Sequence, residues 1–282
     1  MPGTLYLVAT PIGNLGDFSP RAREVMSEVD FIAAEDTRVT KKLMTALDLP
    51  QKPLVSYYEH NRRQRGEEIL ARLLAGENCA LVTDAGTPAV SDPGEDLVAL
   101  CAPEGVPVIP IPGCCAAVCA LAASGLPTGR WCFEGFLSVN KKARREHLDA
   151  LKNEKRSMIF YEAPHKLRAT LDDLCAAFGG ERRISLSREL TKLHEETLRM
   201  TLAEAVAYFA ETAPRGEFVM IVEGVPDVVD EDAEDDRMAR ALNAVQKRIE
   251  NGETLKDAVK MVSADLGVKN NALYQLALEA QE

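Results

Sequence analysis

Short apolar runs alternate with amphipathic segments from the start of the chain. The runs are rich in β-forming residues and predict strands at Leu5–Ala9, Phe31–Ala34, Leu54–Tyr57, Ala80–Thr83 and Val106–Ile109. Between them, apolar residues recur at helical spacing and predict helices at Arg21–Val29, Lys41–Leu49, Glu67–Leu74 and Leu97–Cys101. Strands that alternate with helices form a mostly parallel sheet covered by helices. We therefore predict an N-terminal α/β domain over residues 1–113.

A similar pattern returns after a helix of small residues from Cys115 to Ala123. Five further strands, separated by helices, are predicted at Cys132–Leu137, Met158–Tyr161, Ile184–Ser187, Thr197–Met200 and Phe218–Val222. They indicate a second α/β domain over residues 114–225.

Seven acidic residues and no basic residue lie between positions 227 and 236. A run of one charge sign is typical of a solvated segment, so we interpret residues 226–236 as a linker. Beyond it, Met238, Leu242, Val245 and Ile249 share one helical face. This pattern predicts a small helical module over residues 237–282.

The composition is that of a globular protein, because 46% of the 282 residues are hydrophobic, too many for a disordered chain. The formal charge is −11, and it falls to −4 without the seven acids of the predicted linker. Nowhere do eighteen apolar residues follow one another, and no basic region precedes an apolar run at the start. We expect neither membrane insertion nor export, and we expect a cytoplasmic protein.

The cysteines and histidines point to no metal site. Seven cysteines without a C-x-x-C pair suit neither a disulfide framework nor a zinc site. The four histidines never stand at the i, i+4 spacing that aims two imidazoles at one metal ion. We therefore predict no bound metal.

Three turns rich in glycine and proline follow predicted strands, at residues 10–17, 84–94 and 110–113. The carboxyl ends of parallel strands share one edge of a sheet and bind ligands there, so these turns predict a pocket. Ordinary strand-to-helix turns are the alternative. The first turn has neither G-x-G-x-x-G nor G-K-[ST] spacing, so no dinucleotide or triphosphate is indicated. The absence of a G-x-S-x-G motif disfavours covalent catalysis by serine.

Six motifs, in the right order, resemble the tetrapyrrole methylase superfamily of S-adenosylmethionine-dependent methyltransferases, and its branch that methylates ribosomal RNA most closely. They are Leu7–Asp17, Ala33–Arg38, Val82–Pro88 with Ser91–Gly94, Phe160–Glu162, Arg188–Lys192 and Gly216–Phe218. One departure is Cys114-Cys115, which stands where relatives commonly have a proline and another small residue.

This resemblance implies a bilobed enzyme, often dimeric in the superfamily, with S-adenosylmethionine in the cleft between two α/β domains of the tetrapyrrole methylase type. It also implies 2′-O-methylation of a cytidine ribose in the decoding region of small-subunit ribosomal RNA. Aromatic residues make up only 5% of the chain, so we expect recognition of an assembled ribosomal subunit by shape rather than broad base stacking. The tail resembles the helix-turn-helix-like module of family members.

The resemblance further implies which residues meet the cofactor. These are Pro11, Gly86, Thr87 and Val90 in the first domain, and Cys115, Ala116, Tyr161, Glu162 and Leu190 in the second. Gly13 and Asp84, in the first two turns, complete the set of cofactor candidates.

Methyl transfer from a sulfonium needs an aligned acceptor and a group that takes its proton, but no covalent residue. Asp36 is a candidate to accept the proton or to orient the hydroxyl, and Arg38 is a candidate to bind the adjacent phosphate. The alternative is that the two residues form an ion pair that caps the next helix. Lys192 is interpreted as a phosphate contact, a proton acceptor or a solvated lysine. His165 is a further candidate, although a helix-start residue without a chemical role is favoured there.

Two basic clusters are candidates for contact with RNA phosphates, and solvated helix faces are the alternative. They are Arg62, Arg63 and Arg65, and Lys141, Lys142, Arg144 and Arg145. Two other functions stay open: methylation of a tetrapyrrole or a protein, and a non-catalytic nucleic-acid-binding regulator built around the tail. The tail has seven bases against six acids, whereas a DNA-contacting domain is distinctly basic.

Overall fold

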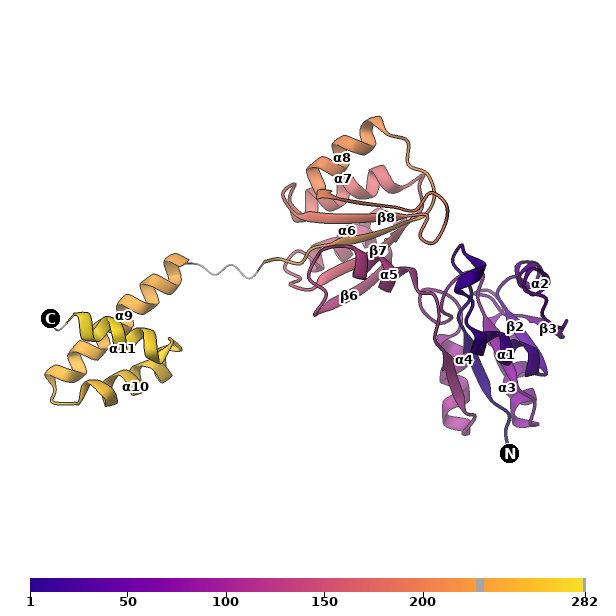
Figure 1. Ribbon diagram of the computed structural model, residues 1–282, viewed down its shortest axis with the longest axis horizontal. Coiled ribbons are helices and arrows are strands. Elements are labelled where there is room, and N and C mark those ends of the chain that lie inside the picture. The colour runs from indigo at the N-terminus through magenta and orange to yellow at the C-terminus, as the bar shows by residue number, and fades with distance from the viewer. Residues whose placement is uncertain (227–230, 281–282) are drawn as a thin grey trace. The chain divides into compact units, whose positions relative to one another are not determined.

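The computed structural model describes residues 1–226 and 231–280, without the side chains of residues 231–236 (Figure 1). The chain divides into two compact units, which we call unit 1 (Met1–Val225) and unit 2 (Pro226–Glu282). Each unit is described by itself. Within the described ranges, no helix is long and apolar enough to cross a membrane.

Unit 1 begins with a five-stranded sheet in the order β3-β2-β4-β1-β5. Its strands are β1 (Leu5–Val8), β2 (Phe31–Ala34), β3 (Leu54–Ser56), β4 (Cys79–Val82) and β5 (Val108–Ile111). Its helices are α1 (Pro20–Glu28), α2 (Thr37–Ala46), α3 (Arg62–Leu74) and α4 (Glu95–Cys101), with short 3-10 helices η1 (Leu15–Asp17) and η2 (Ala102–Glu104). All neighbouring strands run parallel, as the alternation of strands and helices predicts.

Helices α2 and α3 begin earlier than the apolar spacing indicates. Asp36 caps α2 at Thr37, four residues before the predicted start, and α3 begins at Arg62, five residues early. The first turn of α3 is polar and exposed, so it adds nothing to the hydrophobic pattern.

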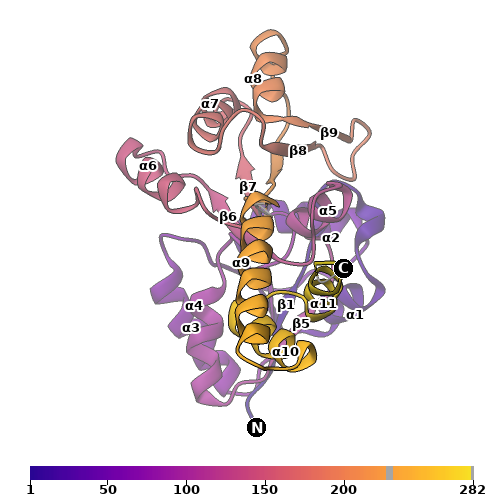
Figure 2. The ribbon, with the colours of Figure 1, turned by 90° about the vertical axis from the view of Figure 1, so that its left-hand side faces the viewer.

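Helices cover both faces of the first sheet. Met26 of α1 and Met44 of α2 are buried on one face. Ile69 of α3 and Leu97 of α4 are buried on the other, where these two helices lie side by side (Figure 2). The helix after β4 therefore lies on the opposite face from the helices that follow β1 and β2. Where the helices that follow two neighbouring strands lie on opposite faces, a crevice opens at the carboxyl ends of these strands. β4 has such a crevice on each side, one toward β1 and one toward β2.

The second sheet of unit 1 has the order β6-β7-β10-β8-β9. Its strands are β6 (Trp131–Phe136), β7 (Ser157–Glu162), β8 (Arg183–Arg188), β9 (Glu196–Thr201) and β10 (Phe218–Val222). Its helices are α5 (Ala116–Ala123), α6 (Lys141–Ala150), α7 (Leu167–Phe178) and α8 (Leu202–Glu211). β6 and β7 are parallel and the other pairs antiparallel. The expectation of a helix between every two strands is wrong for β8 and β9, since antiparallel neighbours need no crossover.

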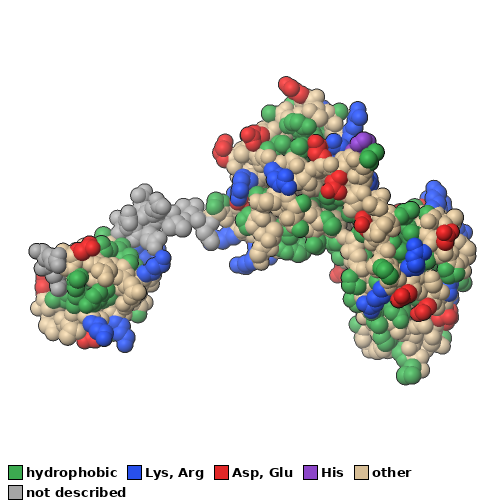
Figure 3. Space-filling model, in the orientation of Figure 1, with side chains coloured by type: hydrophobic (Ala, Val, Ile, Leu, Met, Phe, Trp, Pro, Cys, Tyr) green, Lys and Arg blue, Asp and Glu red, His purple; other side chains and the backbone are tan. Residues whose placement is uncertain are grey.

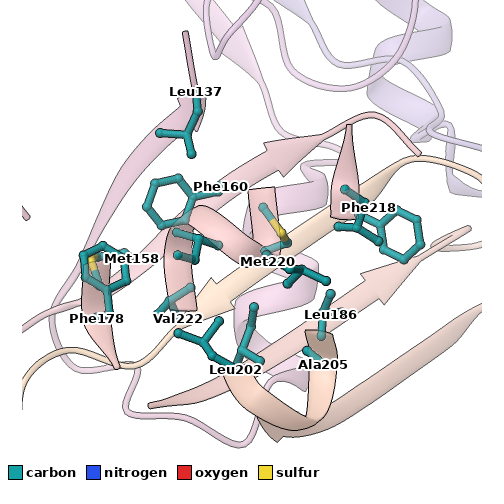
Figure 4. Close-up of a cluster of buried hydrophobic side chains, with 14 of the residues drawn as sticks. Leu137, Met158, Phe160, Phe178, Leu186, Leu202, Ala205, Phe218, Met220 and Val222 are labelled. Atoms are coloured by element: carbon teal, nitrogen blue, oxygen red, sulfur yellow. The ribbon is translucent and has the colours of Figure 1, made fainter. Parts of the chain in front are cut away.

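Both faces of the second sheet are buried as well. Phe160, Leu186 and Met220 belong to the core under α6, α7 and α8 (Figure 4). Ala117 and Ala120 of α5 pack against the opposite face. Their small side chains bring the start of α5 close to the sheet.

Unit 2 consists of α9 (Glu231–Glu250), α10 (Leu255–Leu266) and α11 (Asn270–Glu279), which bury Val245, Val259 and Leu273. The expected helical tail is present, but α9 already begins inside the segment interpreted as a linker. Acidic residues are favourable at a helix N-terminus, so the charge run is compatible with a helix start. Residues 227–230 of that segment lie outside the described residues.

Gly94, which precedes α4, offers a test of this packing. Its φ is 147°, and an added Cβ would lie 2.9 Å from Leu81 Cδ2 and 3.1 Å from the Ala89 amide nitrogen. Gly105 has a φ of 69° with nothing within 4 Å of an added Cβ. We expect Gly105→Ala to lower the free energy of unfolding by about 1 to 2 kcal/mol, and Gly94→Ala to lower it further because of the crowding. Urea unfolding measures both, and equal losses would contradict the crowding.

Candidate active site

Three loops meet at the carboxyl edge of the first sheet. Thr10, after β1, and Gly86, after β4, exchange two backbone hydrogen bonds of 2.9 and 3.1 Å. Thr87 Oγ1 donates a 2.8 Å hydrogen bond to the carbonyl of Cys114, after β5. The three turns singled out by glycine and proline therefore lie together.

These loops line a hollow of about 290 Å³, which we call hollow A, and strands and loops of the second sheet line its other side. Nine of the eleven cofactor candidates line it. They are Asp84, Gly86, Thr87, Val90, Cys115, Ala116, Tyr161, Glu162 and Leu190. The other two, Pro11 and Gly13, flank Ile12, which does line it. An added Cβ at Gly13 would lie 2.5 Å from Lys192 Cγ, so this loop packs directly against the second lobe.

Hollow A is acidic. Six carboxyl groups line it, against the single ammonium group of Lys192. They belong to Glu35, Asp84, Asp92, Glu162, Glu189 and Glu217. A lining of this kind favours a ligand that carries positive charge.

Glu35 and Asp84 connect the ends of β2 and β4. The Asp84 amide donates to Glu35 Oε2, and the Asp36 amide donates to Asp84 Oδ1, both at 3.2 Å. Burial raises the pKa of both carboxyl groups, and the charge of Asp84 raises that of Glu35 further.

Asp92 lies in the same wall. Burial raises the pKa of Asp92 to about 7, and the charges of Glu35, Asp84 and Glu217 act in the same direction. Its carboxyl group therefore keeps its proton to a higher pH than an exposed aspartate does. Neither Asp92 nor Glu35 was among the expected site residues. Their signal in the sequence is an acidic residue in a turn after an apolar run, inside two of the quoted motifs.

Tyr161 joins the second sheet to the start of α5. Its hydroxyl accepts a 3.1 Å hydrogen bond from the Ala117 amide, and its ring packs edge-on against Phe133 and Phe136. Burial raises the pKa of Tyr161 to about 12, so the hydroxyl stays protonated. The contact fixes Cys115 and Ala116 at the rim of hollow A.

Glu162 is held from behind by a buried network. Its carboxylate accepts hydrogen bonds from the Thr170 hydroxyl and from the Ala163 amide, the latter at 2.9 Å. Thr170 in turn accepts a 2.7 Å hydrogen bond from Arg144, which also pairs with Asp173. Arg144, expected at an RNA-contacting surface, is therefore engaged inside the protein, with 13% of its side chain exposed.

Two loops at hollow A contain residues in the left-handed region. Ala89 and Ser91 have φ of 65° and 69° in the loop after β4, and Glu189 and Thr191 have φ of 52° and 66° in the loop after β8. Non-glycine residues adopt this conformation at a cost, and they cluster at functional sites. Spacing and composition alone gave no signal for this strain.

Asp36 and Arg38 form the ion pair that was the alternative interpretation. Asp36 caps α2, accepts the Arg38 amide at 2.8 Å and binds the Arg38 guanidinium through both carboxylate oxygens. Hydrogen bonding to Arg38 lowers the pKa of Asp36 to about 2, which makes it a weak proton acceptor. The Arg38 side chain is 86% exposed. The pair lies beside hollow A, next to Glu35.

The two remaining catalytic candidates, Lys192 and His165, differ in their position relative to hollow A. Lys192 lines hollow A and pairs with Glu189 at 3.0 Å. His165 is exposed in the turn before α7 and lies outside the lining of hollow A.

Both basic clusters lie at helix starts. Arg62 pairs with Glu59 and Asp96, Arg65 with Glu68, and Lys142 with Glu146. Arg63, Lys141 and Arg145 are exposed. On the face of unit 1 shown in Figure 3, basic and acidic side chains are interspersed rather than segregated.

Known proteins resemble this chain in sequence and in fold. The family model described as "Tetrapyrrole (Corrin/Porphyrin) Methylases" matches residues 4–206. The chain belongs to this family. Two curated relatives are called "Ribosomal RNA small subunit methyltransferase I". That of Synechocystis sp. is 48% identical, over 99% of each chain, and that of Halalkalibacterium halodurans is 48% identical, over 97% of this chain and 94% of the relative.

Solved structures of the tetrapyrrole methylase family share the fold. Uroporphyrin-III-C-methyltransferase of Thermus thermophilus has a TM-score of 0.56 at 19% identity, over 81% of this chain and 98% of its own. A structure of the Thermus enzyme complexed with S-adenosyl homocysteine has a TM-score of 0.51 at 18% identity, over 79% and 98%. The predicted two-lobed tetrapyrrole methylase fold is confirmed.

The raised pKa of Asp92 predicts a pH-dependent stability. Between about pH 4 and pH 7 the folded protein keeps a proton on Asp92 that the unfolded chain has lost, so stability falls as pH rises through this window. Asp92→Asn lacks this loss. Its Tm relative to wild type is expected to rise by about 2 to 4 °C between pH 5 and pH 8. Scanning calorimetry measures this, with the exposed Asp172→Asn as control; a difference that does not change with pH would contradict the assignment.

Proposed function

We propose that this protein is an S-adenosylmethionine-dependent methyltransferase that methylates the 2′-oxygen of a cytidine ribose in the decoding region of small-subunit ribosomal RNA. The observation that carries the proposal is hollow A, an acidic crevice between the two sheets of a tetrapyrrole methylase fold. The names of the curated relatives support ribosomal RNA as the substrate.

The lining of hollow A fits this cofactor. S-adenosylmethionine carries a sulfonium and an ammonium group, and six carboxyl groups surround the space. Gly86, with a φ of 91°, brings its backbone to the wall without a side chain. When bound, the cofactor supplies an electrophilic methyl group.

The residues of the chain then have separate roles. Gly86, Thr87 and Val90 would hold the cofactor from the first sheet. Cys115, Ala116, Tyr161, Glu162 and Leu190 would hold it from the second, and Asp84 would face its positive charge. We place Pro11 and Gly13 in support of this wall rather than in contact.

The acceptor RNA would meet the exposed edge of hollow A. Arg38 is held by Asp36 with its side chain in solvent, which suits a bidentate grip on a phosphate. Lys192 and the exposed Arg63, Lys141 and Arg145 are proposed as further phosphate contacts. We propose an assembled small subunit as the substrate, a homodimer as the active form and the cytoplasm as its place.

Cofactor binding should depend on the hydrogen bond between Tyr161 and Ala117. Tyr161→Phe removes it and leaves an amide of α5 without its partner, so we expect the affinity for S-adenosyl homocysteine to fall about 2- to 10-fold. Calorimetric titration measures the affinity. Tyr208→Phe, at a 39% exposed tyrosine of α8, is the control. An unchanged affinity in Tyr161→Phe would contradict the role given to this contact.

The substrate is tested with labelled S-adenosylmethionine and small ribosomal subunits from cells that lack the enzyme. We expect one label per subunit, on the ribose of a cytidine in the decoding region, located by nuclease mapping and mass spectrometry. Label on a protein or on an added tetrapyrrole would move the enzyme to another branch of the family. Absence of saturable cofactor binding would instead support a non-catalytic regulator.

A further inference from the structure

A second hollow opens at the same edge of the first sheet. It has a volume of about 360 Å³ and we call it hollow B. Tyr58, His60 and Arg62, from the segment after β3, line its outer side. Glu35 and Asp92 line both hollows, as does Ser91, so hollows A and B share one wall.

The sheet order explains this shared wall. β4 lies between β2 and β1, and its helix leaves on the opposite face from theirs. The loop after β4 therefore separates two crevices. Hollow A lies on its β1 side and hollow B on its β2 and β3 side.

The outer side of hollow B is a fixed aromatic edge. Tyr58 and His60 pack with ring planes at 89° and centroids 6.2 Å apart. Asn61 holds the segment, because its side chain accepts the Tyr58 amide at 2.8 Å and donates to the Ser56 carbonyl at 3.1 Å. Tyr58 nevertheless remains 40% exposed, so part of its ring is open to a ligand.

The charges in hollow B select against phosphate. Its lining has five carboxyl groups, and its one guanidinium, that of Arg62, is already paired with Glu59 and Asp96. Carboxylates accept hydrogen bonds from ribose hydroxyls and from the N4 amino group of cytosine, whereas they repel a phosphate. An aromatic edge adds a surface for base stacking.

We propose that hollow B seats the acceptor cytidine, turned out of its stack, with its ribose hydroxyl at the wall shared with hollow A and Asp92 as the group that takes the hydroxyl proton. This inference rests on the proposed function. The hydroxyl oxygen bonds to the methyl carbon, the carbon–sulfur bond breaks with its electron pair left on sulfur, and the proton passes to the Asp92 carboxylate.

The surroundings of Asp92 suit a proton acceptor. Three carboxylates repel the negative charge of Asp92: Glu35 after β2, Asp84 in the same loop and Glu217 before β10. Tyr161 on β7 also lies within electrostatic range of Asp92. Burial and these charges make Asp92 a stronger base than an exposed aspartate. Asp36, in contrast, is held in its ionised form by Arg38.

Site-directed cross-linking tests the position of the acceptor. Tyr58 is replaced by p-benzoylphenylalanine, and the protein is irradiated with small subunits from cells that lack the enzyme, without cofactor. We expect the cross-link at the nucleotide that the wild-type enzyme methylates. The same replacement at Tyr208, which is equally exposed, should leave that nucleotide uncrosslinked.

Two outcomes are distinguishable. If the wild-type enzyme methylates a ribose but the Tyr58 cross-link maps away from that nucleotide, the acceptor site is wrong and the proposed function stands. If the wild-type enzyme methylates no RNA, the proposed function itself fails. As a second measurement, Tyr58→Ala should lose about 5- to 150-fold in kcat/KM through lost stacking, with an unchanged affinity for S-adenosyl homocysteine.

Asp92→Asn tests the proton acceptor. We expect kcat to fall about 10²- to 10⁴-fold, and the rise of the wild-type rate with pH to be lost in the variant. Asp172→Asn, at an exposed carboxyl group on α7, should behave as wild type. Direct NMR titration of the Asp92 carboxyl group gives a readout without cofactor. A wild-type rate and pH profile in Asp92→Asn would overturn this role.

Discussion

The carboxyl end of β4 is the constraint on which the site depends. This strand lies between β1 and β2, and its helix leaves on the other face of the sheet. Its loop must therefore form the wall between two crevices. The backbone pair of Thr10 and Gly86 fixes one side of this loop, and the Asp84 amide bonded to Glu35 fixes the other.

The strain and the electrostatic repulsion in this loop have the same origin. Ala89 and Ser91 adopt positive φ, and Gly94 adopts a φ of 147°, in the loop that connects β4 to α4 and lines both hollows. Burial in this turn raises the pKa of Asp92, and the nearby charges of Glu35 and Asp84 raise it further. Both features destabilise the fold, and the buried helices on both faces of the sheet offset them.

Much of the fold could be predicted from the sequence, because buried strands and amphipathic helices leave a strong periodic signal. The ten strands of the described residues lie near their predicted places, and β5 begins two residues later than predicted. The start of α3 at Arg62 was missed because polar exposed turns carry no periodicity. The two strands β8 and β9 could not be identified as a direct hairpin, since the pattern fixes strands but not their direction.

Site residues could be predicted where one loop contains the whole motif. They were harder to predict where the relevant interactions join residues of different loops. Asp84, Gly86 and Thr87 line hollow A and stand in one turn where glycine, proline and acidic residues concentrate, and the family resemblance singles out Gly86 and Thr87 there. Asp92 was not among the predicted site residues. The sequence alone does not distinguish an aspartate that only forms a turn from one whose pKa is raised by its surroundings. Only the fold shows that Glu35, Asp84 and Glu217 act on it. The ion pair of Asp36 and Arg38 required side-chain geometry for the same reason.

The charge distribution also suggests how one protein would bind a cationic cofactor and a polyanionic RNA at the same time. Six carboxyl groups line hollow A and five line hollow B, two of them common to both. Such a wall attracts a sulfonium and repels phosphates, so RNA could enter only through the uncharged part of a nucleotide. The phosphates would then stay at the rim, within reach of exposed cations such as Arg38. An acidic lining of this kind would select the ribose edge of a single nucleotide, and its repulsion of the backbone would keep the rest of the strand outside the proposed methylation site.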